Sequence, residues 1–288
     1  MLRFARAALI ALSATFAVTA CTPVAQNTAQ SIAQEQRNSA RLVQQLEAKD
    51  KLYKDRRLER YLNGVVDRIA RTRPPGSIPV RAYIVKDGDV NAFTTGGGYL
   101  FFNAGMLAAM ENEAQLATVV AHEIAHIDRG HIQASQANRT AIGVGAALAT
   151  IGAAAAGLDP SVARLGVGLG ANAFASNFSR TQETDADNVG IRYLAAAGYN
   201  AVEGARSFEV LRRVHGNRAG ASFFASHPAP GNRQASLTAQ ARKLGATKGR
   251  IGRKSHSRAT RKLRREILKF YDKAGRTREA AQIRRNLR

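Results

Sequence analysis

The five residues His122-Glu123-Ile124-Ala125-His126 decide how this chain is interpreted. Residues four apart in a helix share one face, so both imidazoles can bind the same metal ion. Glu123 stands between them, where a carboxylate can act as general base for a water that the metal activates. The spacing predicts a zinc-dependent hydrolase with His122 and His126 as ligands. The alternative is a core helix with two hydrogen-bonded histidines.

The flanking residues predict that this motif lies within a buried helix. Asn112 and Gln115 have the spacing of a capping box, which marks a helix N-terminus. An apolar stripe with helical periodicity follows, made of Leu116, Val119, Val120, Ile124 and Ile127. No charged residue occurs between positions 114 and 121, and Gly130 is placed to end the helix. We therefore expect a core helix over residues 112–130.

A hydrolytic zinc site usually has three protein ligands and one open position. In the metzincin arrangement a third histidine follows six residues after the second, but that position holds Ile132. His131 lies nine residues from His122, close to the opposite face of a helix. We interpret His131 as a capping residue or as a support for a ligand, and not as a ligand.

A carboxylate is then needed as the third ligand, and ten acidic residues follow His126. Most of them fall in a turn, on an amphipathic surface or in a basic tail. Ser179 and Gln182 form a second capping-box pattern, so Glu183 and Asp187 would share one face of the helix that begins there. Glu183 is the predicted third ligand, and Asp187 would orient a ligand histidine. Alternatively, both acids favour a helix N-terminus and do nothing more.

These motifs together resemble a known family. The order His-Glu-x-x-His, then Ser-Arg-x-x-Glu-x-x-x-Asp, is similar to the HtpX- and BepA-like gluzincins, the membrane-associated zinc endopeptidases of metallopeptidase family forty-eight. The resemblance runs from Asp50 to Arg233. It implies an α+β fold, a mostly helical zincin-type metalloprotease domain with a small β-sheet whose edge strand borders the active site. It also implies one Zn²⁺ per chain, bound by His122, His126 and Glu183.

Two further segments carry the resemblance. Residues 91–99 resemble the family's Asn-Ala-Phe segment, which implies a substrate-binding edge strand containing Asn91, Ala92 and Phe93. Residues 226–233 resemble its His-Pro…Arg element. This second resemblance makes His227 a fourth ligand or an oxyanion contact that can hold the site closed.

The expected reaction is hydrolysis of peptide bonds within unfolded or extended polypeptides. Glu123 would take a proton from the attacking water and pass it to the leaving amine. A substrate would pair as an added strand along the Asn91 segment. This suits a quality-control endopeptidase for unfolded or misassembled envelope proteins. The alternative is a chaperone-like or scaffolding factor that works with outer-membrane assembly proteins, its proteolysis latent or restrained by His227.

The first residues predict export and a lipid anchor. Arg3 and Arg6 precede an apolar run over residues 7–20, typical of a signal peptide over residues 1–20. Residues 18–21, Val-Thr-Ala-Cys, resemble a lipoprotein processing box, which implies lipidation of Cys21. Thr22 at the next position resembles sorting to the inner leaflet of the outer membrane, on the periplasmic side. The alternative is ordinary cleavage that leaves a free thiol. Residues 21–50 are interpreted as a polar tether passing into a first helix.

Positive charge is concentrated at the other end of the chain. Residues 242–288 contain 18 Lys and Arg against 3 acidic residues, so this segment carries +15 of the total net charge of +22. The segment 241–288 is interpreted as a basic helical tail that resembles one degenerate tetratricopeptide-like hairpin. It would contact anionic lipid or lipopolysaccharide; the alternative is a solvated appendage. Export argues against nucleic acid as a partner, although basic tails often bind it. A single cysteine excludes an internal disulfide framework.

The remaining elements follow from periodicity. Helices are expected over residues 35–72, 138–178 in two pieces, 180–197 and 201–214, and strands over residues 79–85 and 98–102. With the core helix, they form a metallopeptidase domain over residues 51–240. The Ala- and Gly-rich residues 140–158 are interpreted as part of a close-packed helical hairpin that gates the site, with a shallow membrane dip as the alternative.

Overall fold

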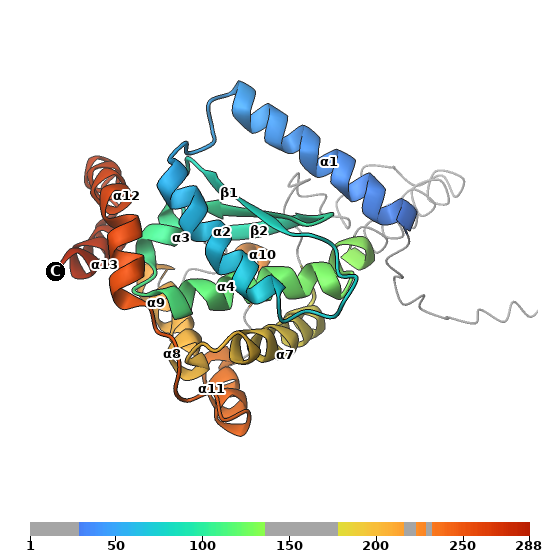
Figure 1. The fold of residues 1–288 in the computed structure, drawn as a ribbon. Coiled ribbons are helices and arrows are strands. Elements are labelled where there is room, and N and C mark those ends of the chain that lie inside the picture. The colour runs from blue at the N-terminus through green and yellow to red at the C-terminus, as the bar shows by residue number, and fades with distance from the viewer. Residues whose placement is uncertain (1–28, 136–177, 216–222, 229–231) are drawn as a thin grey trace, which may run out of the picture.

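The computed structural model of the chain describes residues 29–135, 178–215, 223–228 and 232–288. The predicted signal peptide, Cys21 and the expected helices over residues 138–178 therefore lie outside the described residues. The elements in chain order are α1 (Ala29–Ala48), α2 (Arg56–Ala70), β1 (Arg81–Val85), β2 (Ala92–Gly96), β3 (Tyr99–Asn103), α3 (Ala104–Ala109), α4 (Glu113–Asp128), α7 (Arg180–Ala196), α8 (Ala201–Ala205), α9 (Ser207–His215), α10 (Phe223–Ser226), α11 (Arg233–Lys243), α12 (Arg253–Lys273) and α13 (Thr277–Leu287). The predicted α+β class is confirmed: helices surround one small sheet (Figure 1).

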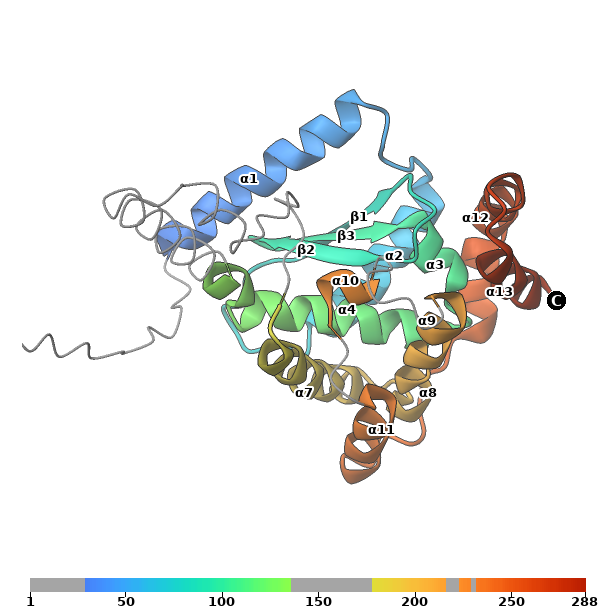
Figure 2. The same ribbon diagram turned by 180° about the vertical axis from the view of Figure 1, so that it is seen from behind.

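The sheet has three strands in the order β1-β3-β2. Strand β1 runs parallel to β3, whereas β2 runs antiparallel to it, with Ala92 opposite Phe102 and Phe93 opposite Phe101. Strand β2 is thus at one edge of the sheet, as the Asn-Ala-Phe segment predicted. One face of the sheet lies over α2 and α4, and α1 crosses the other face (Figures 1 and 2).

Helix α4 carries the His-Glu-x-x-His motif through the centre of the molecule. Every residue from Glu113 to Ile127 is buried, because the sheet lies on one side of the helix and α7 on the other (Figure 2). Asn112 caps the helix by accepting a hydrogen bond from the Gln115 amide at 3.0 Å. Gln115 Oε1 accepts from the Glu111 amide at 2.9 Å instead of from Asn112, so the reciprocal bond of the capping box is shifted by one residue.

Helix α7 approaches α4 closely at one glycine. A Cβ atom on Gly190 would lie 3.2 Å from the backbone of Ala121 and from the His122 amide nitrogen. Such contacts are tighter than most side chains tolerate, so glycine permits this crossing. The predicted capping box of α7 is present in full: Gln182 N donates to Ser179 Oγ, and Ser179 N donates to Gln182 Oε1. The crossing brings the first turns of α7 beside the motif on α4.

The helix expected over residues 35–72 is wrong, because the structure has two helices there. Asp55 caps α2, with its carboxylate accepting from the amides of Arg57 and Leu58 at 3.0 and 3.1 Å. The segment before it is extended enough for Leu52 to pair with Val85 beside the sheet. The structure also places residues 29–48, interpreted as tether, in helix α1, which contacts β2. Among the described residues, no helix is long and apolar enough to cross a bilayer.

The basic segment is part of the domain core and not a solvated appendage. Helices α12 and α13 meet at a turn containing Gly275 and contribute buried residues to the same apolar cluster as α4, namely Leu263, Ile267, Tyr271, Ala280 and Ile283. One of the basic residues, Arg264, is 1 % exposed and donates to the carbonyl oxygens of Ala108 and Met110 at 3.2 and 2.7 Å. A guanidinium is well suited to the free carbonyls at the end of a helix such as α3.

Candidate metal centre

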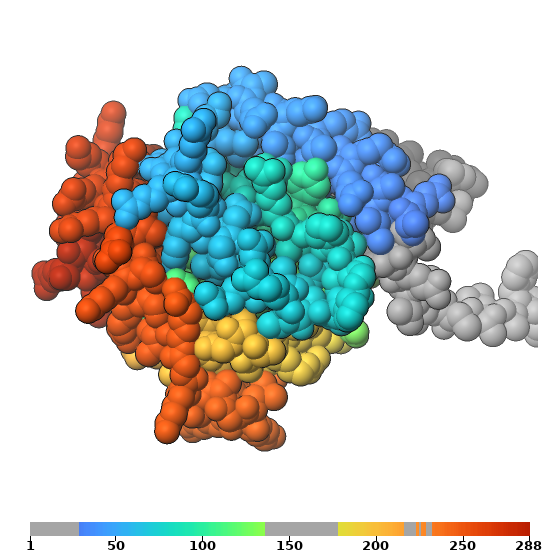
Figure 3. All heavy atoms as spheres, in the orientation of Figure 1, coloured from blue at the N-terminus to red at the C-terminus, as the bar shows by residue number. Residues whose placement is uncertain are grey.

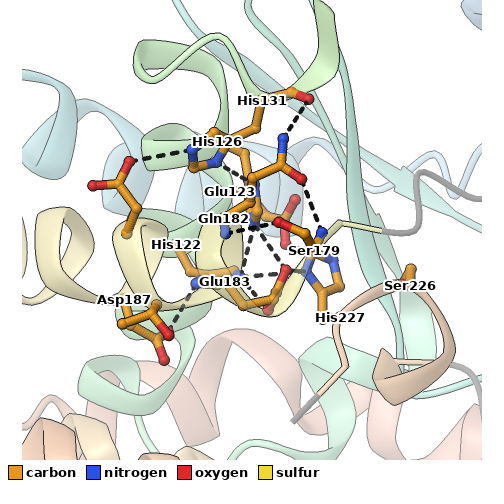
Figure 4. A network of polar contacts seen from close by, with 12 residues as sticks. His122, Glu123, His126, His131, Ser179, Gln182, Glu183, Asp187, Ser226 and His227 are labelled. Carbon is orange, nitrogen blue, oxygen red and sulfur yellow. Dashed lines mark hydrogen bonds and ion pairs between the residues drawn. The ribbon is translucent and has the colours of Figure 1, made fainter. Parts of the chain in front are cut away.

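Four side chains from three elements converge on one point beside α4. His122 and His126 come from α4, Glu183 from the first turn of α7, and His227 from the residue after α10 (Figure 4). One ligand atom from each lies within 4.8 Å of the other three. Glu123, His126, Glu183 and His227 are 0 % exposed, and His122 is 5 % exposed. Imidazole nitrogens and a carboxylate form the donor set that zinc prefers.

The distances show how tightly the donors are grouped. His122 Nε2 lies 3.0 Å from His126 Nε2, so two nitrogens of the same kind face each other. Glu183 Oε1 lies 3.3 Å from His126 Nε2 and 3.0 Å from His227 Nδ1. Glu183 Oε2 lies 3.4 Å from His122 Nε2. Two imidazole nitrogens and a carboxylate grouped this closely suit a divalent cation, whose binding would replace any proton held on Nε2.

Glu123 is buried against this group without a hydrogen bond of its own. Neither of its carboxylate oxygens has a hydrogen-bond partner among the described residues. His227 Nε2 is 3.3 Å from Glu123 Oε1, an ion-pair distance without hydrogen-bond geometry. Burial raises the pKa of Glu123 above its usual range. Buried orphan carboxylates are rare and need an explanation, which the role of proton acceptor for a reacting water supplies.

The outer nitrogens of both α4 histidines also have partners. His122 Nδ1 lies 3.0 Å from Asp187 Oδ1, a contact that would hold the proton on Nδ1 and direct Nε2 to a metal, the role predicted for Asp187. His126 Nδ1 lies 2.9 Å from His131 Nδ1. His131 Nε2 in turn lies 3.2 Å from Asp185 Oδ2. His131 thus contacts a predicted ligand, the arrangement that a supporting role would require, whereas no pattern in the sequence indicated Asp185.

The sequence analysis gave no role to Arg233, although it ends the His-Pro…Arg element. This guanidinium is 4 % exposed and donates to both oxygens of Asp187, at 2.7 and 2.6 Å, and to Glu183 Oε2 at 2.8 Å. Its other side lies over the ring of Phe208, with the Cζ atom 4.5 Å from the ring centroid. Arg233 therefore fixes two carboxylates of the site at once. No local pattern predicts this contact, because the partners lie 46 and 50 residues away.

The electrostatics of the site favour a cation between its carboxylates. Burial disfavours the charged form of His122, yet Glu183 and Asp187 together raise its pKa to about 9. Burial would raise the pKa of Glu183, but His227 and His122 outweigh it and lower that pKa well below its usual range. Burial lowers the pKa of His126, so its imidazole stays neutral. A neutral imidazole beside an ionised carboxylate has the protonation that metal binding requires.

Two phenylalanines cover the rings of the site. Phe178 stacks on His126, with ring centroids 3.7 Å apart, and Phe223 stacks on His227 at 4.6 Å.

The predicted substrate segment lies in the neighbouring sheet: Ala92 and Phe93 begin β2, which contacts α4, and Asn91 precedes it. Ala92 is buried and Phe93 is half-buried. Apolar rings and the sheet thus exclude water from the metal-binding group.

The residues that match known proteins are those that build this site. The model of a family described as Peptidase family M48 matches residues 53–241. The chain belongs to peptidase family M48. The match includes α4, α7 and Arg233. The family resemblance inferred from the motifs is confirmed.

Individual relatives agree with the family. The chain is 28 % identical to the beta-barrel assembly-enhancing protease of Escherichia coli (strain K12) over 177 residues, which cover 59 % of the chain and 36 % of that protein. It is 31 % identical to the metalloprotease LoiP of the same organism over 157 residues, 54 % of the chain and 60 % of LoiP. It is 27 % identical to the mitochondrial metalloendopeptidase OMA1 of Schizosaccharomyces pombe over 169 residues, 58 % of the chain and 48 % of that protein. The chain spans about a third of the length of the beta-barrel assembly-enhancing proteases that it matches.

Proposed function

We propose that this protein is a zinc metalloendopeptidase that cleaves unfolded or misassembled envelope proteins. The observation that carries the proposal is the buried convergence of His122, His126 and Glu183, with the orphan carboxylate of Glu123 beside them. These three ligands would hold one Zn²⁺ per chain, since they supply the imidazole and carboxylate donors of hydrolytic zinc sites. When bound, zinc would supply Lewis acidity that activates water and polarises the scissile carbonyl.

The remaining chemistry belongs to side chains of the chain. Glu123 accepts the proton of the attacking water and passes it to the leaving amine, a transfer favoured by its raised pKa. Asp187 and His131 hold His122 and His126 in the tautomers that direct Nε2 toward the metal. An extended substrate would pair with the edge of β2 that faces away from β3, starting at Asn91, Ala92 and Phe93. Backbone hydrogen bonds do not depend on which side chains the substrate carries. This mode of binding therefore suits unfolded substrates of varied sequence.

The test separates metal binding from catalysis. Purified wild-type protein and the Glu123→Gln variant are compared for bound zinc and for cleavage of casein. We expect about one zinc per chain in both, and cleavage only in the wild type. Removing one essential proton acceptor should lower the rate by about 10²–10⁴-fold. Unchanged turnover by zinc-loaded Glu123→Gln protein would defeat the assignment.

We place this activity at the outer membrane, on the periplasmic side. The signal peptide over residues 1–20 would direct export and then be removed, and the lipid on Cys21 would anchor the protein there, since acylation holds proteins at bilayers. The name of the beta-barrel assembly-enhancing relatives supports a link to outer-membrane assembly proteins as partners. The basic segment 241–288 would add contact with anionic lipid or lipopolysaccharide.

A second function has one specific observation in its favour. His227 is 0 % exposed and lies within 3.3 Å of His122 Nε2, Glu183 and Glu123, so a fourth side chain occupies the position where a substrate would approach. The protein would then be a chaperone-like or scaffolding factor with latent proteolysis. A His227→Ala variant distinguishes the two: zinc without casein cleavage in the wild type, with cleavage in His227→Ala, would indicate a latent protease.

A further inference from the structure

Helix α12 has two faces of different chemistry. Its buried face consists of His256, Thr260, Leu263, Arg264, Ile267 and Tyr271. On the opposite face, five exposed cations recur at helical spacing and form what we call the basic stripe, namely Lys254, Arg258, Arg261, Arg265 and Lys269. The stripe covers 15 residue steps, about 22 Å of helix. Because the buried face fixes α12 to the core, the basic stripe is a rigid row of charges.

The basic stripe borders a groove formed with another part of the domain. An open groove of about 830 Å³ lies between the stripe and the start of α2, where Arg57 adds a further cation. Figure 3 shows this side of the molecule, where the start of α2 in blue adjoins the orange side chains of α12. Glu266 is the one acidic residue that lines the groove, and the Tyr53 hydroxyl donates to its carboxylate at 2.7 Å. The groove is therefore strongly cationic.

The charges of the basic stripe are not used inside the fold. Among the described residues, no carboxylate lies within ion-pair distance of any stripe member. Cations three and four residues apart repel one another along a helix. Arg253 and Lys254 lie in the first turn of α12, where the helix dipole disfavours positive charge. The arrangement opposes helix stability, so an anion outside the chain is the partner that would offset it.

We propose that the basic stripe and its groove bind the phosphate groups of an anionic lipid bilayer. Guanidinium groups match phosphate oxygens with paired hydrogen bonds, and four of the six cations named are arginines. A rigid row about 22 Å long fits a surface with many phosphates better than a single small anion.

A bilayer is favoured over a nucleic acid by the proposed location. The inference rests on the proposed envelope function for the presence of anionic lipid, but not for the binding chemistry. Its test therefore uses no proteolysis and no lipid anchor. The chain from residue 22 onward keeps every described residue and lacks Cys21, so the groove must act alone.

The experiment measures flotation with vesicles of phosphatidylcholine alone and of phosphatidylcholine with about one-third phosphatidylglycerol, at about 0.1 M salt. One variant neutralises the stripe: Lys254→Gln, Arg258→Gln, Arg261→Gln and Arg265→Gln. A matched control removes the same charge from exposed residues elsewhere: Arg192→Gln, Arg242→Gln, Lys243→Gln and Lys248→Gln. A third variant replaces the three stripe arginines by lysine. Each stripe cation near the surface should strengthen partitioning about fivefold.

The wild type should bind the anionic vesicles and not the neutral ones. The stripe variant should lose about 100-fold or more in affinity for the anionic vesicles, while the affinity of the control changes less than about threefold. The affinity of the lysine variant should fall between these two, because it keeps the charge but loses the paired hydrogen bonds. The stripe variant should melt no lower than the wild type, because it loses repulsive pairs. Equal losses in the stripe variant and the control would overturn the proposal in favour of net charge alone. Tighter binding to a DNA duplex than to anionic vesicles at the same salt would also overturn it.

Discussion

Arg233 and Asp187 form a buried ion pair in which the guanidinium Nε and Nη2 donate to the two carboxylate oxygens at 2.7 and 2.6 Å. The same guanidinium reaches Glu183, a proposed metal ligand, and Asp187 reaches His122, another one. One arginine from α11 thus connects a ligand on α7 with a ligand on α4. The pair ties the metal-binding group to the packing of the helices around it.

Replacing Arg233 should destabilise the protein strongly. An Arg233→Ala variant removes the guanidinium that pairs with both Asp187 and Glu183, and breaking such a buried ion pair costs about 3–5 kcal/mol in the free energy of unfolding. Urea denaturation measures this difference. Arg242→Ala on the same helix is the control, because Arg242 is exposed, and it should change stability by less than about 0.5 kcal/mol. Similar values for both variants would show that the buried ion pair contributes nothing specific.

Replacing His131 should weaken metal binding without removing a ligand. His131 contacts His126 Nδ1 at 2.9 Å, and losses of such outer partners typically lower metal affinity about 10–100-fold. Competition with a chromogenic zinc chelator measures the affinity of the His131→Ala variant. His215→Ala is the control, since His215 is also buried but its imidazole bonds to the Val90 carbonyl at 3.2 Å and, among the described residues, to no predicted ligand. Equal zinc affinity in wild type and His131→Ala would refute the supporting role.

The basic segment 241–288 should contribute to the stability of the fold as well as to the charge of the protein. Leu263 on α12 is 1 % exposed within the main apolar cluster, so Leu263→Ala should lower the free energy of unfolding by about 2–5 kcal/mol. Leu244, between α11 and α12, is 46 % exposed, so Leu244→Ala should stay within about 0.5 kcal/mol of the wild type. Denaturant midpoints give both values. An equally small loss at Leu263 would restore the interpretation of residues 241–288 as an appendage.

Local patterns in the sequence predicted the centre of the fold. The spacing of His122 and His126 requires only a helix, and the caps at Asn112 and Ser179 are contacts within a few residues. A carboxylate could be proposed as the third ligand by elimination, because few acidic residues follow the motif. These features depend on residues that are close together in the chain, so their spacing can be recognised in the sequence.

Contacts between residues that are far apart in the chain could not be predicted from such local patterns. Nothing near Arg233 shows that it meets α7, and nothing near Arg264 shows that it donates to carbonyls at the end of α3. A count of charges treats Arg264 as solvated although it is 1 % exposed. The break between α1 and α2 had a local signal, the cap at Asp55, which helical periodicity on both sides concealed.

Docking of α1 on the sheet should depend on pH through Glu35. This carboxylate is 4 % exposed and lies against Gly96 and Gly97 at the β2–β3 turn, where the Gly97 amide donates to its Oε2 at 2.8 Å. Its Oε1 has no partner among the described residues. Burial, opposed in part by the Gly97 hydrogen bond, raises the pKa of Glu35 from its ordinary 4.5 to about 7. Docked α1 therefore favours the protonated carboxyl.

The direction of the pH effect on docking follows from the proton that Glu35 takes up when α1 docks. Between pH 4.5 and about 7 the docked state holds the extra proton, so docking weakens as pH rises through this window and is constant above it. The equilibrium should change by on the order of 100-fold. Hydrogen-exchange protection factors of the α1 amides, measured at pH 5 and pH 8, report this difference. Glu35→Gln should keep α1 protected at both values, whereas Glu47→Gln, an exposed carboxyl on the same helix, should behave like the wild type. Protection in the wild type that does not fall between these two conditions would contradict the assignment to Glu35.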